Sequence, residues 1–350
     1  MRLLHVMASA PDGGAEMTML DSVLALANTG AVTQYVVTRS NNDWRLDRFS
    51  EAGIGYATTN LNPTLPALSR YKLARIIDRF RPDVIQYWKA RAGRFTFSRH
   101  SARSVAWHGG TARTNRLAGC AWHQGSSPGV IADFLTAGVD EHKAFLLPPF
   151  SGGIETAPLH RHEFGVPDRA PLALVLSRLH AKKGLNTLLD AIRMVDGLYL
   201  FIAGDGPMRG ALEAQIKAQR MDERIKLLGW RNDRIALIQM ADFVVCPSRI
   251  EPFGKTIIDA WAAGKPVIAA DAVGPSTLIT PGETGLIVRR GDDEAMARAM
   301  QQLIDFPDLC CKLGAAGREA SDNEFSREQF VGQMMAIYQR VIEEAGPFSR

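Results

Sequence analysis

Residues 243–270 read FVVCPSRIEPFGKTIIDAWAAGKPVIAA, and the order of elements in this segment indicates the fold class. Two apolar runs of strand length, 243–247 and 266–270, flank a loop at 251–254 and a segment of helical periodicity that begins near Lys255. A strand, a crossover helix and a second strand form the basic unit of a parallel sheet that is covered by helices. The stretch therefore predicts an α/β fold with a doubly wound parallel sheet.

Strand-length apolar runs separated by helical patterns recur on both sides of this stretch. In chain order they lie at 3–8, 34–38, 83–87, 104–107, 144–147, 172–176, 198–203, 225–228 and 285–288. Between the fifth and the sixth run, residues 148–153 read PPFSGG, a proline and glycine cluster that neither a strand nor a helix tolerates. We therefore expect two Rossmann-like domains, 1–155 and 156–325, and a helix over 326–350 that packs back on the first domain.

The bulk composition is that of a globular protein. The 350 residues are 46% hydrophobic and 22% charged, and no run approaches the ~18 apolar residues that a membrane span requires. The first residues lack the apolar core of a secretory signal. The four cysteines show neither a disulfide framework nor a Cys-x-x-Cys pair. We expect a cytoplasmic protein with reduced thiols.

Positive charge is concentrated in one segment. Twelve Lys and Arg residues lie between Arg70 and Arg116, with only two acidic residues to balance them. Residues 70–81 fit the solvated face of an amphipathic helix. Residues 89–103 mix cations with aromatic side chains, which is typical of a surface that rests on anionic lipid. We expect reversible binding to the inner face of the cytoplasmic membrane and a lipid-linked or phosphorylated binding partner. Because no nucleic-acid recognition motif is present, no nucleic-acid partner is expected.

A glycine pair follows the first predicted strand. Gly13 and Gly14 lie between that strand and a helical pattern, where bare backbone N–H groups and a helix N-terminus can receive phosphate oxygens. A tight turn without a ligand explains the same residues equally well, so both interpretations stay open.

A cationic loop follows the first strand of the second series. Residues 177–185 read SRLHAKKGL. Arg178 and Lys183 could both reach a pyrophosphate at the carboxyl ends of the strands, where open α/β sheets bind ligands. The alternative is a solvated loop without a ligand.

The loop and helix after residue 247 form the most specific motif. Gly254 allows backbone to approach a ligand closely, and the helix that begins near Lys255 directs its N–H groups to the same place. Glu251 and Asp259, about two helical turns apart, place two carboxylates on one side of the element. This arrangement suits paired sugar hydroxyls, although a surface acid and a helix acid without any ligand remain possible.

In order and spacing these motifs resemble the retaining glycosyltransferases of family four over nearly the whole chain. The resemblance rests on GGAE at 13–16, SRL at 177–179, GDGP at 204–207, EPFG at 251–254 and AGKPVIA at 263–269, of which the last two are the most specific. That family has the GT-B architecture, so the resemblance implies two facing Rossmann-like, doubly wound domains with a cleft between them. It also implies transfer of a hexose from a GDP- or UDP-linked donor.

The resemblance assigns the donor sugar to one set of residues. This set consists of Glu251 and the backbone of Phe253, Gly254 and Lys255. His108, at the end of a predicted strand, would face the same sugar. The expected catalytic residues are therefore His108 and Glu251.

The rest of the donor is assigned to a second set. Arg178 and Lys183 would hold the diphosphate and stabilise the departing nucleotide. Asp259 would hold the ribose, although the family usually has Glu at this position. Gly13 and Gly14 would contact the substrate from the N-terminal, acceptor-binding domain.

No metal or cofactor other than the nucleotide-sugar substrate is expected. The sequence contains no Asp-x-Asp and no cluster of His, Cys and carboxylate residues with metal-ligand spacing. Positive charge from the diphosphate clamp would stabilise the leaving group instead. The expected function is synthesis of lipopolysaccharide or cell-surface polysaccharide, with a glycan or lipid-linked acceptor. Two alternatives stay open: a nucleotide-sugar epimerase or hydrolase of the same fold, and a non-catalytic nucleotide-sugar-binding partner.

Overall fold

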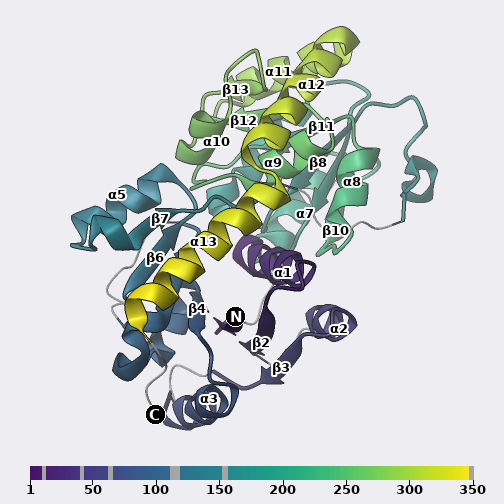
Figure 1. Cartoon of the computed structure of the whole chain (residues 1–350). Coiled ribbons are helices and arrows are strands. Elements are labelled where there is room, and N and C mark those ends of the chain that lie inside the picture. Colours follow the sequence, from purple (N-terminus) through teal and green to yellow (C-terminus); the bar gives the residue numbers. More distant parts are fainter. Residues whose placement is uncertain (10–12, 40–42, 62–65, 111–118, 152–156, 347–350) are drawn as a thin grey trace. The chain divides into compact units, whose positions relative to one another are not determined.

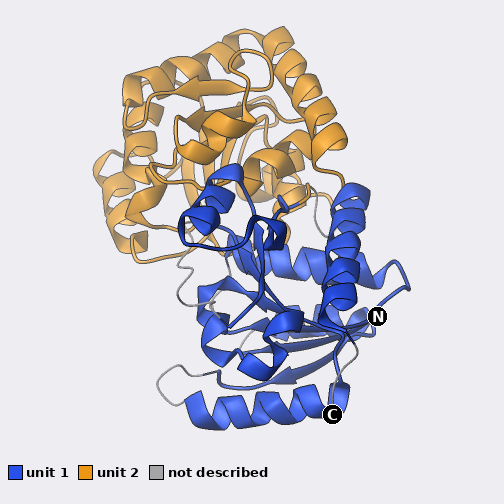
Figure 2. Cartoon of the chain, turned by 60° about the vertical axis from the view of Figure 1, so that its left-hand side comes forward, with its two compact units in different colours: residues 1–149, 327–350 blue, residues 150–326 orange. Residues whose placement is uncertain are grey.

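A computed structural model describes residues 1–9, 13–39, 43–61, 66–110, 119–151 and 157–346 of the chain. The chain divides into two compact units (Figure 2). Unit 1 comprises residues 1–149 and 327–350, and unit 2 comprises residues 150–326. The boundary expected between residues 155 and 156 falls in the segment 152–156, which lies outside the described residues.

Unit 1 is built on a parallel sheet of seven strands in the order β3-β2-β1-β4-β5-β6-β7 (Figure 1). The strands are β1 (Arg2–Met7), β2 (Thr33–Thr38), β3 (Gly55–Thr58), β4 (Val84–Trp88), β5 (Ser104–His108), β6 (Trp122–Gly125) and β7 (Ala144–Leu146). The helices are α1 (Gly14–Ala27), α2 (Asp43–Glu51), α3 (Pro66–Phe80), α4 (Lys89–Ala92), α5 (Pro128–Thr136) and α13 (Arg327–Ala345).

Two strands of this sheet were not predicted from the sequence. β3 is a short edge strand whose side chains are mostly exposed, so it lacks an apolar run. β6 reads WHQG and is buried along its whole length, although three of its four residues are not hydrophobic. Burial of polar side chains within a sheet leaves no hydrophobic pattern to detect.

Unit 2 is built on a parallel sheet of six strands in the order β10-β9-β8-β11-β12-β13. The strands are β8 (Leu172–Leu176), β9 (Tyr199–Ala203), β10 (Ile225–Gly229), β11 (Phe243–Cys246), β12 (Val267–Ala270) and β13 (Leu286–Val288). The helices are α6 (Leu185–Ile192), α7 (Arg209–Ala218), α8 (Arg234–Met240), α9 (Lys255–Ala262), α10 (Val273–Leu278), α11 (Asp293–Asp305) and α12 (Pro307–Glu324). The expected doubly wound α/β fold is confirmed, and all six strands of unit 2 were predicted.

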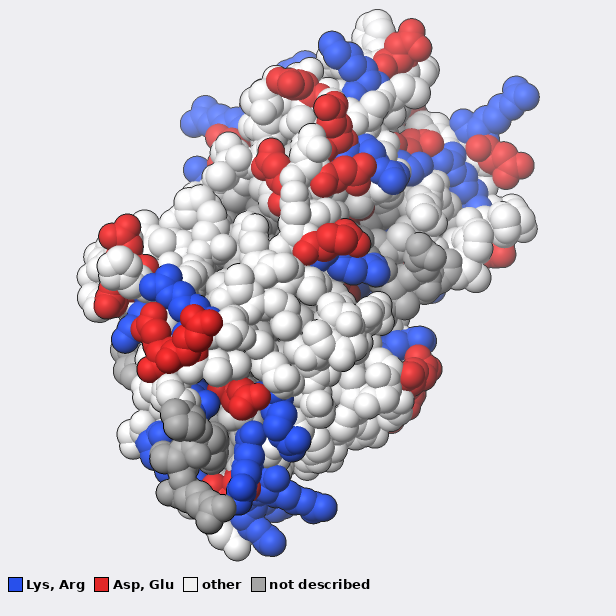
Figure 3. Space-filling model, viewed as in Figure 1, with Lys and Arg blue, Asp and Glu red and all other residues white. Residues whose placement is uncertain are grey.

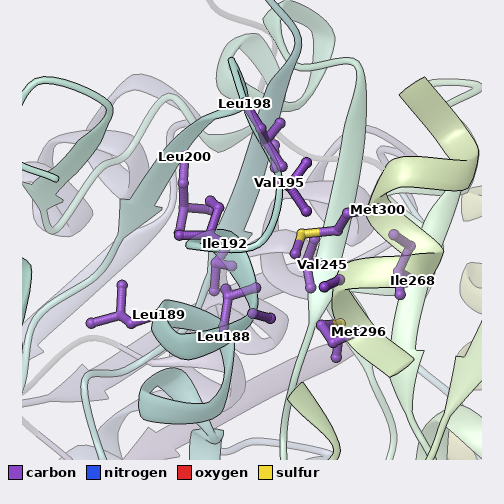
Figure 4. Packing of buried hydrophobic residues seen from close by; sticks show 14 of the residues in the cluster. Leu188, Leu189, Ile192, Val195, Leu198, Leu200, Val245, Ile268, Met296 and Met300 are labelled. Carbon is purple, nitrogen blue, oxygen red and sulfur yellow. The ribbon is translucent and has the colours of Figure 1, made fainter. Parts of the chain in front are cut away.

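The sheet of unit 2 is buried on both faces. On one face, Val245 and Ile268 of the sheet pack against Leu188 and Ile192 of α6 and Met300 of α11 (Figure 4). On the other face, apolar residues of the same strands pack against α8 and α9. A parallel strand that is covered on both faces needs a nearly continuous apolar sequence. These strands could therefore be predicted from the sequence alone.

The C-terminal helix α13 is part of unit 1. Its buried face carries Phe330, Met334 and Tyr338, and the Tyr338 hydroxyl donates a hydrogen bond to Gln86 Oε1 of β4 at 2.9 Å. In the described part of the chain, no helix combines the length and the apolar character that crossing a bilayer requires.

Candidate functional site

The loops that follow β8 and β11 are joined at the carboxyl edge of the unit 2 sheet. The Lys182 carbonyl accepts hydrogen bonds from the backbone N–H groups of Arg249 and Ile250, at 2.9 and 3.1 Å. Gly184 has φ +66°, and a Cβ at this position would lie 2.0 Å from the carbonyl oxygen of Pro247. Only glycine therefore allows the two loops to approach this closely.

These joined loops bring Lys183 and Glu251 into direct contact. Lys183 Nζ lies 2.5 Å from Glu251 Oε2, and their side chains are 24% and 16% exposed. The hydroxyl of Ser248 donates to the same carboxylate oxygen at 3.4 Å. Two predicted site residues that are 68 positions apart in sequence thus form one partly buried ion pair. A cation and a carboxylate side by side can engage a diphosphate and a sugar hydroxyl of one ligand.

Arg178 lies on the same loop as Lys183 and is exposed. No hydrogen bond or ion pair joins its side chain to any residue in the described ranges. Its backbone is held firmly, because the Leu179 N–H donates to the Asp205 carbonyl at 3.0 Å and Gly204 has φ +147°. A Cβ on Gly204 would lie 1.9 Å from the Ser177 carbonyl oxygen. The guanidinium therefore projects from a fixed loop with its donors available to an anion.

The loop before α9 is also fixed from two sides. Gly254 adopts φ +108° at the N-cap of α9, a conformation that favours glycine. The Glu251 carbonyl accepts a hydrogen bond from Gly274 N at 2.8 Å. The Phe253 ring is buried and meets the Phe325 ring edge to face at 6.1 Å. The backbone predicted to hold the sugar is thus preorganised at the start of a helix.

Asp259 has two cationic partners that the sequence analysis did not find. Its Oδ1 lies 2.9 Å from Lys255 Nζ, and its Oδ2 lies 3.3 Å from Arg234 Nε at the start of α8. The carboxylate is 3% exposed. Lys255 Nζ also donates to the Phe150 carbonyl at 3.2 Å. Asp259 and Glu251 therefore have separate sets of partners, and the predicted ribose contact of Asp259 remains a prediction.

In the glycine pair of unit 1, neither backbone conformation requires glycine at Gly13 nor does space require it at Gly14. Gly13 is fully extended, with φ −177°, and a Cβ on Gly14 would meet nothing within 4 Å. The first turn of α1 carries Glu16, which is buried and forms an ion pair with Lys89 at 2.6 Å. Residues 10–12, directly before the glycine pair, lie outside the described residues. Phosphate binding by this turn stays a prediction.

His108 ends β5 and is buried among aromatic rings. Its ring centroid lies 4.8 Å from that of Phe134 of α5 and 5.9 Å from that of His123 of β6. His108 Nε2 has no hydrogen-bond partner in the described structure. Burial, followed by the nearby His123, lowers the pKa of His108 to about 3. The imidazole is therefore neutral at physiological pH. Neither His123 nor Phe134 was predicted as a neighbour, because β6 was not recognised.

Unit 1 should lose stability in acid because of its buried histidines. The pKa of His108 is lowered to about 3 and that of His5 to about 4, in both cases mainly by burial. Between about pH 6.5 and pH 4 the unfolded chain binds more protons than the folded chain. The free energy of unfolding should therefore fall by up to about 1.4 kcal/mol per pH unit for each histidine as the pH decreases. Urea unfolding followed by hydrogen exchange of unit 1 peptides measures this slope. His5→Gln should flatten it, and an unchanged slope would contradict the assignment.

Part of the predicted membrane surface lies in the interior of unit 1. Within residues 89–103, Phe95 is fully buried, and Lys89 is paired with Glu16. The expectation of an exposed aromatic side chain is therefore wrong for Phe95, which fills the core instead of facing lipid. Phe97 is half-buried and Arg91 and Arg94 are exposed, so for these residues the membrane surface stays a prediction. Arg113 and Arg116 lie outside the described residues.

In the described part of the chain, no group of three or more His, Cys, Asp and Glu residues is arranged to hold a metal ion. The cations of the candidate site, Arg178 and Lys183, are the groups placed to interact with negative charge on a ligand.

The chain is similar in sequence to known glycosyltransferases. Residues 157–320 match the family model described as glycosyl transferases group 1, and all the unit 2 site residues lie within this range. Two lipopolysaccharide core biosynthesis glycosyltransferases of Rhizobium meliloti are each 29% identical to the chain. LpsD aligns over 97% of this chain and 98% of its own length, and LpsE over 91% and 93%.

Solved structures share the fold. The crystal structure of Anabaena Alr3699/HepE in complex with UDP-glucose has a TM-score of 0.84 at 20% identity and covers 97% of this chain and 99% of its own. WaaG, a glycosyltransferase involved in lipopolysaccharide biosynthesis, has a TM-score of 0.71 at 16% identity and covers 95% of this chain and 99% of its own. The family model and the two relatives identify the chain as a glycosyltransferase, and the solved structures show that it has the GT-B fold.

Proposed function

We propose that this chain is a retaining, metal-independent hexosyltransferase of family four. It takes a hexose from a UDP- or GDP-linked donor and transfers it to a glycan or lipid-linked acceptor. The observation that carries this proposal is the contact between Lys183 and Glu251 at the carboxyl edge of β8 and β11. Open α/β sheets bind ligands at this edge.

The two joined loops divide the donor between them. Arg178 and Lys183 bind the diphosphate, since cations with several N–H donors suit phosphate oxygens. Glu251 and the backbone from Phe253 to Lys255 bind hydroxyls of the hexose. Asp259 holds the ribose, directly or through water.

In the reaction, the bond between the anomeric carbon and the diphosphate breaks while the acceptor oxygen attacks from the same face. The leaving phosphate takes the acceptor proton. Arg178 and Lys183 stabilise the negative charge that develops on the diphosphate, and they do so from loops fixed before the reaction begins. Glu251 orients the sugar through its hydroxyls. We assign to His108, which is neutral at physiological pH, one hydrogen bond with the sugar.

The acceptor class is suggested by the relatives. LpsD and LpsE are named as glycosyltransferases of lipopolysaccharide core biosynthesis, and both align over nearly their full length. We place this chain in the synthesis of the same class of surface glycan. Its acceptor is then attached to lipid in the inner leaflet, so the enzyme works in the cytoplasm as a peripheral protein on an anionic membrane, without a nucleic-acid partner.

A thermal-shift panel of nucleoside diphosphates and their sugars tests the donor assignment, because a ligand that binds only the folded chain raises the melting temperature. UDP and UDP-glucose are the first candidates, since HepE binds them. We expect one nucleotide series to raise the melting temperature by several degrees.

Chelation should leave both donor binding and transfer unchanged, because Arg178 and Lys183 supply the positive charge. The measurement is the initial rate with and without excess EDTA, after extensive dialysis. A loss of rate that is restored by Mg²⁺ or Mn²⁺ would overturn metal independence. Rapid consumption of donor without any acceptor would favour a hydrolase or epimerase instead.

A further inference from the structure

Helix α3 presents an exposed stripe of unusual composition. The residues of the stripe are Leu68, Tyr71, Lys72, Arg75 and Arg79. Their spacing of three, four and seven positions places them on one side of the helix. The opposite side carries Ser69, Leu73 and Ile77, which are buried in unit 1. The stripe is therefore the face of α3 that points directly away from the core.

Two apolar side chains of the stripe are left in solvent. Leu68 is 63% exposed and Tyr71 is 60% exposed, and both are among the most exposed large hydrophobic residues in the described chain. They occupy the N-terminal part of α3, and the three cations follow. The distance from the first to the last residue of the stripe is about 16 Å along the helix, since each residue adds about 1.5 Å. All five residues of the stripe could therefore contact one flat surface at the same time.

The three cations of the stripe have no partner among the described residues. No hydrogen bond or ion pair joins Lys72, Arg75 or Arg79 to a described residue. Arg81, Arg91 and Arg94 of the same basic segment are exposed and their side chains also have no described partner, whereas three other cations of the segment are paired. Arg99 pairs with Asp78 at 3.2 Å, Lys89 pairs with Glu16, and Arg103 donates to the Asp83 carbonyl at 3.2 Å. The single acid beside the stripe, Asp78, is thus already neutralised.

Lys and Arg side chains gather at the lower end of the view in Figure 3, where α3 lies in Figure 1. A helix face with a few exposed apolar residues and several cations matches the interface of an anionic bilayer, into which Leu and Tyr insert shallowly. A folded protein partner would need a larger apolar area than two side chains provide.

We propose that this stripe of α3 is the surface by which the chain binds anionic lipid bilayers. The inference rests on the proposed function in so far as a lipid-linked acceptor requires the enzyme to reach a membrane. It moves the apolar part of the membrane-binding surface from Phe95, which is buried, to α3. Leu68 and Tyr71 enter the headgroup region, while Lys72, Arg75 and Arg79 lie against lipid phosphates.

Cosedimentation with vesicles tests the proposal. Vesicles of neutral phosphatidylcholine are compared with vesicles that contain 30% phosphatidylglycerol, at low and high salt. Each Lys or Arg near an anionic surface changes the partition coefficient by about fivefold. We therefore expect Lys72→Ala, Arg75→Ala and Arg79→Ala together to lower binding to anionic vesicles about 100-fold. Leu68→Ala with Tyr71→Ala should weaken binding to the same vesicles without changing its salt dependence.

A matched control removes three exposed cations from unit 2, Arg193, Lys217 and Lys312. This variant should bind vesicles as the unchanged protein does. Equal losses in both triple variants would show that only net charge matters, and unchanged binding of the α3 variants would place the membrane surface elsewhere. Either result overturns the proposal.

Activity is measured separately on a detergent-solubilised acceptor, and the α3 variants should keep it. If the unchanged protein does not bind vesicles but transfers sugar, the α3 assignment fails and the proposed transferase stands. If it binds vesicles through α3 but transfers nothing, the proposed function fails while the surface assignment stands.

Discussion

Glu251→Gln should lower turnover about 100-fold and at the same time strengthen binding of the free nucleoside diphosphate. The turnover loss follows from removal of a charge-assisted hydrogen bond to the hexose, which contributes about 1.5–3 kcal/mol. The gain in affinity follows from the ion pair in the ligand-free chain. Lys183 Nζ lies 2.5 Å from Glu251, so the diphosphate must compete with the carboxylate for this cation. Removing the carboxylate removes the competitor.

The two effects are measured independently. Steady-state kinetics with donor and acceptor give turnover, and calorimetry with the diphosphate alone gives affinity, which we expect to rise roughly threefold to tenfold, on the scale of ~1 kcal/mol for a partly exposed ion pair. Glu283→Gln is a suitable control, because Glu283 is an exposed acid of unit 2 away from the site. Wild-type turnover in Glu251→Gln, or weaker diphosphate binding, would show that Glu251 does not hold the sugar beside Lys183.

The strands and site loops of unit 2 could be predicted from the sequence because these strands are buried on both faces. Continuous apolar runs such as 172–176 identify the strands, and glycines that adopt positive φ identify the loops between them. Gly184 and Gly254 are examples, since both adopt positive φ where the site is formed. The motif residues Arg178, Lys183 and Glu251 follow those strands directly, so topology alone places them on one edge of the sheet.

The sequence did not predict the surroundings of side chains whose partners lie far away along the chain. β6 was missed because polar residues such as His123 and Gln124 are buried in it, and with it the surroundings of His108 were missed. The pairing of Asp259 with Arg234 joins residues 25 positions apart on two helices, and no local pattern reports it. The aromatics of the basic segment were assigned to a surface because local composition cannot distinguish a core strand from an exposed loop.

Lys183→Ala and Arg178→Ala should each weaken nucleoside-diphosphate binding by about 1.5–3 kcal/mol, which corresponds to roughly 10- to 150-fold in the dissociation constant. Both residues supply N–H donors to phosphate oxygens, and neither contact can be replaced by alanine. Lys182→Ala provides the matched control, because Lys182 is an exposed cation on the same loop. Calorimetry with the diphosphate should show a small change for this control. Unchanged affinity in both test variants would remove the diphosphate assignment.

The two variants should differ in stability, and this difference tests the ion pair itself. The Arg178 side chain forms no hydrogen bond or ion pair with a described residue, so Arg178→Ala should leave the melting temperature nearly unchanged. Lys183→Ala leaves the partly buried carboxylate of Glu251 without its cation and should lower the melting temperature. Adding Glu251→Gln to Lys183→Ala removes that uncompensated charge. The double variant should therefore regain stability but not diphosphate affinity or turnover. The double variant could instead lose as much stability as Lys183→Ala and Glu251→Gln lose separately when their losses are summed. This result would mean that Lys183 and Glu251 do not interact in solution, and the candidate site would then lack their contact.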